Sequence, residues 1–195
     1  MSNVLVIHPS DRSTDFLKKV YEGKGYDVIN DCRISDFDLL YEIIHHDKII
    51  MMGHGTPGGL INPEYFNRGF STKRYDGRVY EPLRPFIIDS KYAPFLAEKE
   101  TISIWCNSDK FYALNNLSDG NLHTGMIISE VSEEMYILKD VPLDEDEILE
   151  NMNLFAEAVH DSLDMKPEEM IENILNIYDG DDEVTQYNRT NIKLV

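Results

Sequence analysis

The chain has 195 residues, of which 42% are hydrophobic, and a formal net charge of −18. This composition supports one sizeable core. The chain lacks the clustered Lys and Arg side chains needed to bind the phosphate backbone of DNA or RNA. No apolar run approaches the ~18–20 residues of a membrane-spanning helix, and the first residues do not look like an export signal. We therefore expect a cytoplasmic protein that contacts neither membrane nor nucleic acid.

Short apolar runs alternate with amphipathic segments in the first 52 residues. Runs at residues 3–8, 26–29 and 48–52 predict three strands. Apolar residues at helical spacing predict helices after residue 16 and after residue 35. Strands that are apolar along their whole length and separated by helices are typical of a parallel sheet covered on both faces. The predicted fold class is α/β.

The middle of the chain starts with an irregular stretch and then becomes regular again. Residues 57–88 hold four prolines and a turn signal at 75–78 that predicts a hairpin at the edge of the sheet. After it, the pattern predicts a helical turn at 93–99, a fourth strand at 101–105, a helix at 110–117, a fifth strand at 125–129 and a helix at 133–138.

The last third of the chain is helical and acidic. Acids in the first turn favour a long helix from residue 144, a second helix is predicted at 167–178, and the polar tail beyond residue 179 is expected to be loosely held. We divide the chain into an α/β core at 1–140 and a helical extension at 141–195 packed on the same domain. Nineteen acidic residues and two lysines between Glu130 and Glu183 account for 17 of the 18 excess negative charges. They form either solvated helix faces or a surface for a basic protein partner.

Two reactive side chains follow predicted strands. His54 comes after the third strand and Cys106 after the fourth, and in an open parallel sheet the carboxyl ends of strands form the usual site of ligands and catalysts. A cysteine attacks as its thiolate, and a departing amine needs a proton from a group that titrates near neutral pH. Helix amides after Cys106 would favour its anion, and the N–H of Gly55 is a candidate donor to an oxyanion.

The sequence motifs around these two residues resemble those of a known superfamily. Gly53-His54-Gly55 after one apolar strand, and Cys106-Asn107-Ser108-Asp109-Lys110-Phe111 after another, resemble the caspase–gingipain–legumain superfamily of cysteine peptidases. This resemblance implies a caspase-like three-layer sandwich with strand order 2-1-3-4-5. It also implies that Cys106 is the nucleophile, that His54 is the general acid/base, and that the N–H groups of Gly55 and Cys106 form the oxyanion hole. No cofactor is implied.

The resemblance also points to the residues that would select a substrate. The family usually has a small residue before the nucleophile, whereas this chain has Trp105, which we expect to reshape or close the substrate pocket. Family members use the loop after the first strand and the end of the fifth, which here carry Asp11, Arg12 and Glu130. Asp11 and Glu130 would favour Lys or Arg before the cut bond, whereas Arg12 would favour Asp or Glu. Because two carboxylates compete with one guanidinium, we expect a basic substrate residue before the cut bond.

Two other functions fit the same residues. A catalytically inactive caspase-fold module that binds a peptide or protein shares every fold signal. A zinc-dependent hydrolase would use His8, His54 and a carboxylate such as Asp11 if the first and third strands were neighbours. Neither Cys32 nor the pair His45-His46 has a pattern that indicates a site of its own.

Overall fold

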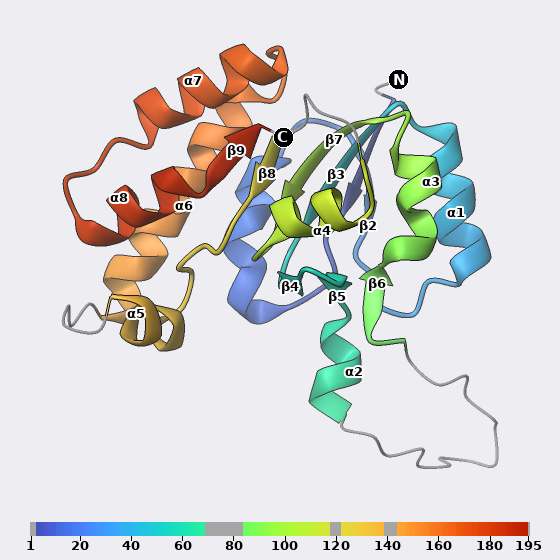
Figure 1. The fold of residues 1–195 in the computed structure, drawn as a ribbon, viewed down its shortest axis with the longest axis horizontal. Helices are drawn as coiled ribbons and strands as arrows, with labels where there is room; N and C mark the ends of the chain where they lie inside the picture. The colour runs from blue at the N-terminus through green and yellow to red at the C-terminus, as the bar shows by residue number, and fades with distance from the viewer. Residues whose placement is uncertain (1–2, 69–83, 118–121, 139–143, 195) are drawn as a thin grey trace.

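The centre of the protein is a six-stranded sheet. The computed structural model describes residues 3–68, 84–117, 122–138 and 144–194. The sheet has the strand order β2-β1-β3-β7-β8-β9 (Figure 1). Its strands are Val4–Ile7 (β1), Asp27–Ile29 (β2), Lys48–Met52 (β3), Glu100–Ile104 (β7), Leu122–Thr124 (β8) and Ile192–Leu194 (β9). All pairs are parallel except β8 with β9. The predicted α/β class is confirmed, and the order of the five parallel strands is the expected 2-1-3-4-5.

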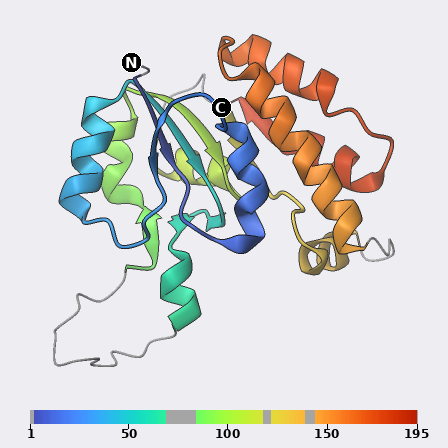
Figure 2. The same cartoon turned by 180° about the vertical axis from the view of Figure 1, so that it is seen from behind.

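Helices lie on both faces of this sheet and make three layers. The helical segments are Arg12–Val20 (η1), Asp36–His45 (α1), Pro63–Arg68 (α2), Ser90–Tyr92 (η2), Ala93–Leu96 (α3), Ser108–Leu114 (α4), Val131–Ile137 (α5), Glu145–Ser162 (α6), Pro167–Ile177 (α7) and Glu183–Thr190 (α8). Seen from behind, η1 and α6 lie side by side over one face, with α1 and α3 over the other (Figure 2).

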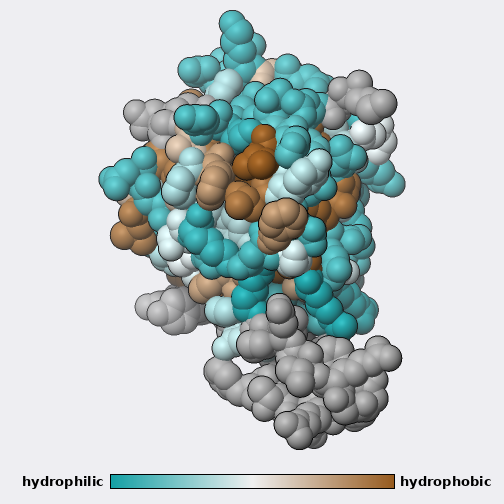
Figure 3. Space-filling view, turned by 90° about the vertical axis from the view of Figure 1, so that its right-hand side faces the viewer, coloured by the Kyte–Doolittle hydropathy of each residue, from teal (hydrophilic) through white to brown (hydrophobic). Residues whose placement is uncertain are grey.

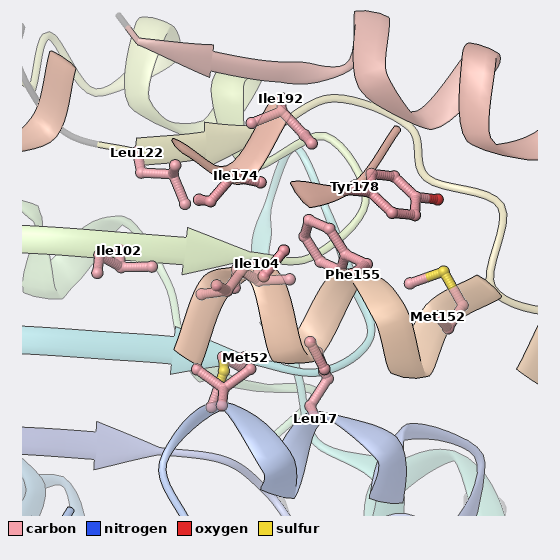
Figure 4. Packing of buried hydrophobic residues seen from close by; sticks show 14 of the residues in the cluster. Leu17, Met52, Ile102, Ile104, Leu122, Met152, Phe155, Ile174, Tyr178 and Ile192 are labelled. Carbon is pink, nitrogen blue, oxygen red and sulfur yellow. The ribbon is translucent and has the colours of Figure 1, made fainter. Parts of the chain in front are cut away.

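The alternation of strand side chains divides the core into two clusters. Val6, Ile50 and Ile102 face η1, α6 and α7, whereas Leu5 and Ile49 face the opposite layer of α1, α3 and α4. Successive side chains of a strand point to opposite faces, so strands that are apolar throughout supply both layers. Figure 4 shows the first cluster, where side chains from η1, the strands, α6 and α7 converge. The helices of the last third therefore share a core with the sheet.

A second, small sheet follows β3. It consists of Gly55–Thr56 (β4), Gly59–Ile61 (β5) and Phe86–Ile88 (β6), paired antiparallel. Gly59 has φ +137°, and a Cβ there would lie 1.9 Å from the carbonyl oxygen of Ile88, so only glycine fits. The small sheet spans the two ends of the stretch expected to be irregular, while the predicted hairpin at 75–78 lies outside the described residues.

Two sequence predictions in the second half are wrong. The fifth strand is Leu122–Thr124 rather than 125–129, and the later residues run on to the start of α5 without pairing as a strand. The tail beyond residue 179 is not loose, because it forms α8 and then β9, with Val184, Asn188 and Ile192 buried. Asn188 both donates to and accepts from the backbone of Ile128, which links α8 to the segment between β8 and α5. The polar composition of this tail therefore gave no indication that it packs against the rest of the protein.

The outer surface has two features of note. Apolar side chains are exposed over α1 and α3, among them Phe37 (77% exposed), Ile44 (47%) and Phe95 (39%), and Figure 3 shows apolar side chains gathered on this side of the molecule. On the opposite side, Lys19 of η1 pairs with Glu157 of α6. Among the described residues, no helix combines the length and apolarity needed to cross a membrane.

Candidate functional site

The ends of β3 and β7 bring His54 and Cys106 to the same edge of the sheet. The two strands are parallel neighbours whose register ends with Met52 opposite Ile104. Beyond that pair, the amide of Gly53 still donates to the carbonyl of Ile104, at 3.1 Å. His54 and Cys106 are each the second residue past the last pair, so both follow the carboxyl ends of neighbouring strands.

The imidazole of His54 lies among oxygen atoms. Its Nε2 is 2.7 Å from Ser13 Oγ, 3.4 Å from Glu130 Oε1 and 3.9 Å from Asp11 Oδ2, and its side chain is 27% exposed. The Ser13 hydroxyl donates to Asp11 Oδ1 at 3.1 Å, so its oxygen is free to accept from the ring. Nε2 is then the protonated nitrogen and Nδ1 is the basic one. Asp11, which also caps η1 through the amide of Ser13, orients this relay.

The Cys106 sulfur has different surroundings. Its hydrogen-bond partners are the carbonyl oxygen of Ile127, at 3.5 Å, and Glu133 Oε1, at 3.7 Å. Burial, and after it the negative charge of Glu133, raises the pKa of the Cys106 thiol to about 12. Among the described residues, no hydrogen bond joins this sulfur to His54. The sulfur is therefore a protonated thiol in this conformation.

The start of α5 connects the two reactive side chains. Glu130 caps this helix and reaches His54, while Glu133, one turn later, reaches Cys106. Glu133 Oε2 accepts from the amides of Ser129 and Glu130 and from the Ser129 hydroxyl. These three donors fix the carboxylate and leave only Oε1 to face the sulfur. Two carboxylates, three residues apart on one helix, thus contact the two members of the pair.

The amides expected to stabilise an anion are arranged differently from the sequence prediction. The first amides after Cys106 are engaged, because Asn107 donates to Gly125 and Ser108 donates to Trp105. Neither of these two amides donates to the Cys106 sulfur. Gly55 lies in β4 next to the hydrogen bond from Ile61 to His54, at a position of the ladder where its N–H points away from β5. That N–H and the N–H of Cys106 stay the predicted oxyanion donors.

Trp105 is buried and explains the need for glycine at position 55. The ring is 2% exposed, packs edge-on against Phe111 and donates from Nε1 to the carbonyl of Thr56. A Cβ on Gly55 would lie 1.9 Å from Trp105 Cδ1. The sequence led us to expect that Trp105 would reshape or close a substrate pocket, and the structure places its ring in the core. Its contact with Gly55 joins the ends of β3 and β7.

The remaining histidines do not join the site. His8 follows β1 next to β3, but its ring is buried against Tyr21 and Thr14, and burial lowers its pKa to about 4. His123 is fully buried in β8, where neither ring nitrogen has a hydrogen-bond partner among the residues that the structure describes, and its pKa is also lowered to about 4. Within the described ranges, no group of three or more His, Cys, Asp or Glu side chains could hold a metal ion. The zinc alternative gains no support.

The sequence did not single out Ser13 or Glu133. Glu133 had a local signal, because Glu130 and Glu133 stand three apart at a predicted helix start, as in a capping box. Ser13 had no such signal, since its contact with His54 spans 41 residues.

Comparisons with protein-family models, with curated proteins and with solved structures found no match. The assignment of a function therefore depends on the geometry of this edge of the sheet.

Proposed function

We propose that the protein is a cysteine peptidase of the caspase/gingipain-like type that cleaves peptide bonds through Cys106 and His54. The observation that carries the proposal is the register of β3 and β7, which brings an imidazole and a thiol to adjacent strand ends. The strand order 2-1-3-4-5 and the Gly-His-Gly and Cys-Asn-Ser sequences support the same function.

The reaction follows from the relay at His54. The thiol proton of Cys106 passes to Nδ1 of His54, and the sulfur attacks the peptide carbonyl carbon. When the C–N bond breaks, His54 returns the proton to the leaving amine and an acyl-enzyme remains. Water then adds to the acyl carbon and gives a proton to His54, which passes it to the sulfur as the C–S bond breaks, so that the acid product leaves and the thiol is restored. Ser13 and Asp11 hold Nε2 protonated throughout, so that Nδ1 exchanges the proton.

The charges at the site support a basic residue before the cut bond. Asp11 and Glu130 lie 3.9 Å and 3.4 Å from His54 Nε2, and their side chains are 23% and 39% exposed. Both carboxylates can therefore reach a cation that binds beside the imidazole. A Lys or Arg side chain would pair with them, whereas an Asp or Glu side chain would be repelled.

Peptide cleavage tests the proposal. Peptides with Lys or Arg before the cut bond should be cleaved faster than matched peptides with Asp or Glu. Cys106→Ala should abolish cleavage and His54→Ala should reduce it by at least about 100-fold. The control is Cys32→Ala, which removes the other thiol, a buried one. Activity that survives Cys106→Ala would rule the proposal out.

A second function rests on the state of the sulfur. Because the Cys106 thiol has a pKa of about 12 and only acceptors around it, an inactive caspase-fold module that binds a basic peptide is the competing proposal. Binding of a basic peptide, measured by calorimetry, without cleavage and with equal affinity in wild type and Cys106→Ala, would select the binding module.

A further inference from the structure

The polar partners of Cys106 are both hydrogen-bond acceptors. A thiol can donate to the Ile127 carbonyl or to Glu133 Oε1, whereas a thiolate would face two oxygen atoms, one of them charged. The geometry therefore opposes loss of the proton that a nucleophilic cysteine must lose. Yet Cys106 is partly exposed, so a small reagent can reach it.

The carboxylate of Glu133 is rigidly held in this position. Three donors from Ser129 and Glu130 occupy Oε2, at 2.8, 3.0 and 3.2 Å. Glu133 cannot turn from the sulfur without breaking these bonds. Its contact with Cys106 spans 27 residues and joins α5 to the end of β7.

Few other charges act on the sulfur. Glu130, on the same helix as Glu133, adds a second negative field. Tyr187 of α8 lies near this pair. Its pKa is raised mainly by burial, and Cys106 and Glu133 add to the rise. His54, at the end of β3, is engaged with Ser13 and Glu130. On α4, Asp109 is paired with Lys193.

We propose that Glu133 is an inhibitory carboxylate, which keeps Cys106 as a resting thiol until Oε1 leaves the sulfur. The inference rests on the proposed peptidase function, for which it supplies a restraint within the chain. The nucleophile becomes active when the start of α5 shifts, or when a cation offsets the Glu133 charge. The Sγ–H proton can then pass to His54 Nδ1 while the sulfur keeps the electron pair of that bond.

The substitution Glu133→Gln separates the charge from the fold. Glutamine serves at the third position of a capping box as glutamate does. The three donors at Oε2 require an acceptor, so the amide oxygen must occupy that position. The amide NH₂ then takes the place of Oε1, facing the sulfur, and can donate to a thiolate. The variant thus replaces an acceptor by a donor at an unchanged position.

Alkylation by iodoacetamide at a series of pH values measures the thiolate directly. The rate at Cys106 is determined by peptide mass spectrometry, with Cys32 in the same molecule as the reference. In Glu133→Gln the pH profile of Cys106 should move down by at least one unit, which makes alkylation about tenfold faster at pH 8. Glu133→Asp, which retracts the charge by one methylene group, should shift the profile in the same direction by less.

The matched control is Glu147→Gln. Glu147 occupies the same capping-box position on α6, where its side chain accepts from the amide of Asp144, and it has no contact with Cys106. This variant should alkylate as wild type does. Circular dichroism checks that each variant is folded. Wild-type profiles in both Glu133→Gln and Glu133→Asp would overturn the proposal.

Alkylation needs no peptide substrate, so the two proposals can fail separately. A faster reaction in Glu133→Gln without cleavage of any peptide would keep the inhibitory carboxylate and reject the peptidase. Cleavage by the wild type, with unchanged alkylation in both Glu133 variants, would keep the peptidase and reject the inhibitory carboxylate.

Discussion

The ends of β3 and β7 lie side by side but surround their reactive groups in opposite ways. His54 is partly exposed and has its Nε2 among three oxygen atoms from Ser13, Asp11 and Glu130. Cys106 is largely desolvated, and its pKa is raised to about 12. Strand order brings two groups to one edge, but the packing around each group decides its protonation state. The imidazole contacts a hydroxyl and two carboxylates, whereas the thiol faces a carbonyl and one carboxylate oxygen.

The end of β1 shows the same contrast, because its histidine is buried whereas His54 is partly exposed. The largest effect on stability is expected from this buried histidine. The buried ring of His8 has a folded pKa of about 4, whereas an unfolded histidine titrates near 6.5. Between these values the unfolded state binds more protons, so stability falls as the pH falls from 6.5 to 4, by up to about 3 kcal/mol from this group. The fully buried His123 acts in the same direction.

Urea unfolding between pH 7.5 and 4.5 measures this loss. His8→Gln should unfold with a smaller decrease in stability over this range than the wild type. His54→Gln, which replaces the partly exposed ring that follows β3, is the control. An unchanged pH dependence in His8→Gln would mean that the end of β1 is not desolvated, and the contrast with His54 would disappear.

The contact between the two strand ends carries the next effect. Gly55→Ala would place a Cβ 1.9 Å from the Trp105 ring, which is enclosed by the core and cannot move freely. We expect a loss of about 1–3 kcal/mol in the free energy of unfolding, as in other overpacked cores. The double variant Gly55→Ala with Trp105→Leu should recover part of it. Additive losses would show that Trp105 does not require the glycine.

The smallest effect concerns the orientation of His54. Ser13→Ala removes the oxygen that accepts from Nε2, so the ring loses its defined tautomer but keeps its carboxylate neighbours. We expect the kcat of peptide cleavage to fall about 3- to 10-fold with little change in KM, the size of one hydrogen bond. Ser13→Thr, which retains the hydroxyl, should restore it. Equal losses in both variants would indicate that η1 was disturbed rather than the ring.

The sequence predicted the features that depend on local periodicity. Apolar runs predicted the parallel strands with small errors, except at the fifth, where a run at 125–129 was taken for the strand at Leu122–Thr124. The polar tail hid α8 and β9, because their burial depends on Asn188 bonding to the distant backbone of Ile128. Of the residues predicted for the site, Asp11 and Glu130 lie beside His54, while Trp105 is buried in the core.

The order of residues along the chain by itself determined which groups follow the strands, since an apolar run that ends in Gly-His-Gly or in Cys is a local pattern. Only the tertiary structure decided what surrounds those groups. The hydrogen-bond partners of the sulfur lie 21 and 27 positions away, and His54 is bonded to a serine 41 positions earlier. Such neighbours determine the pKa of a thiol. Because they are far away in the sequence, no local sequence pattern predicts them.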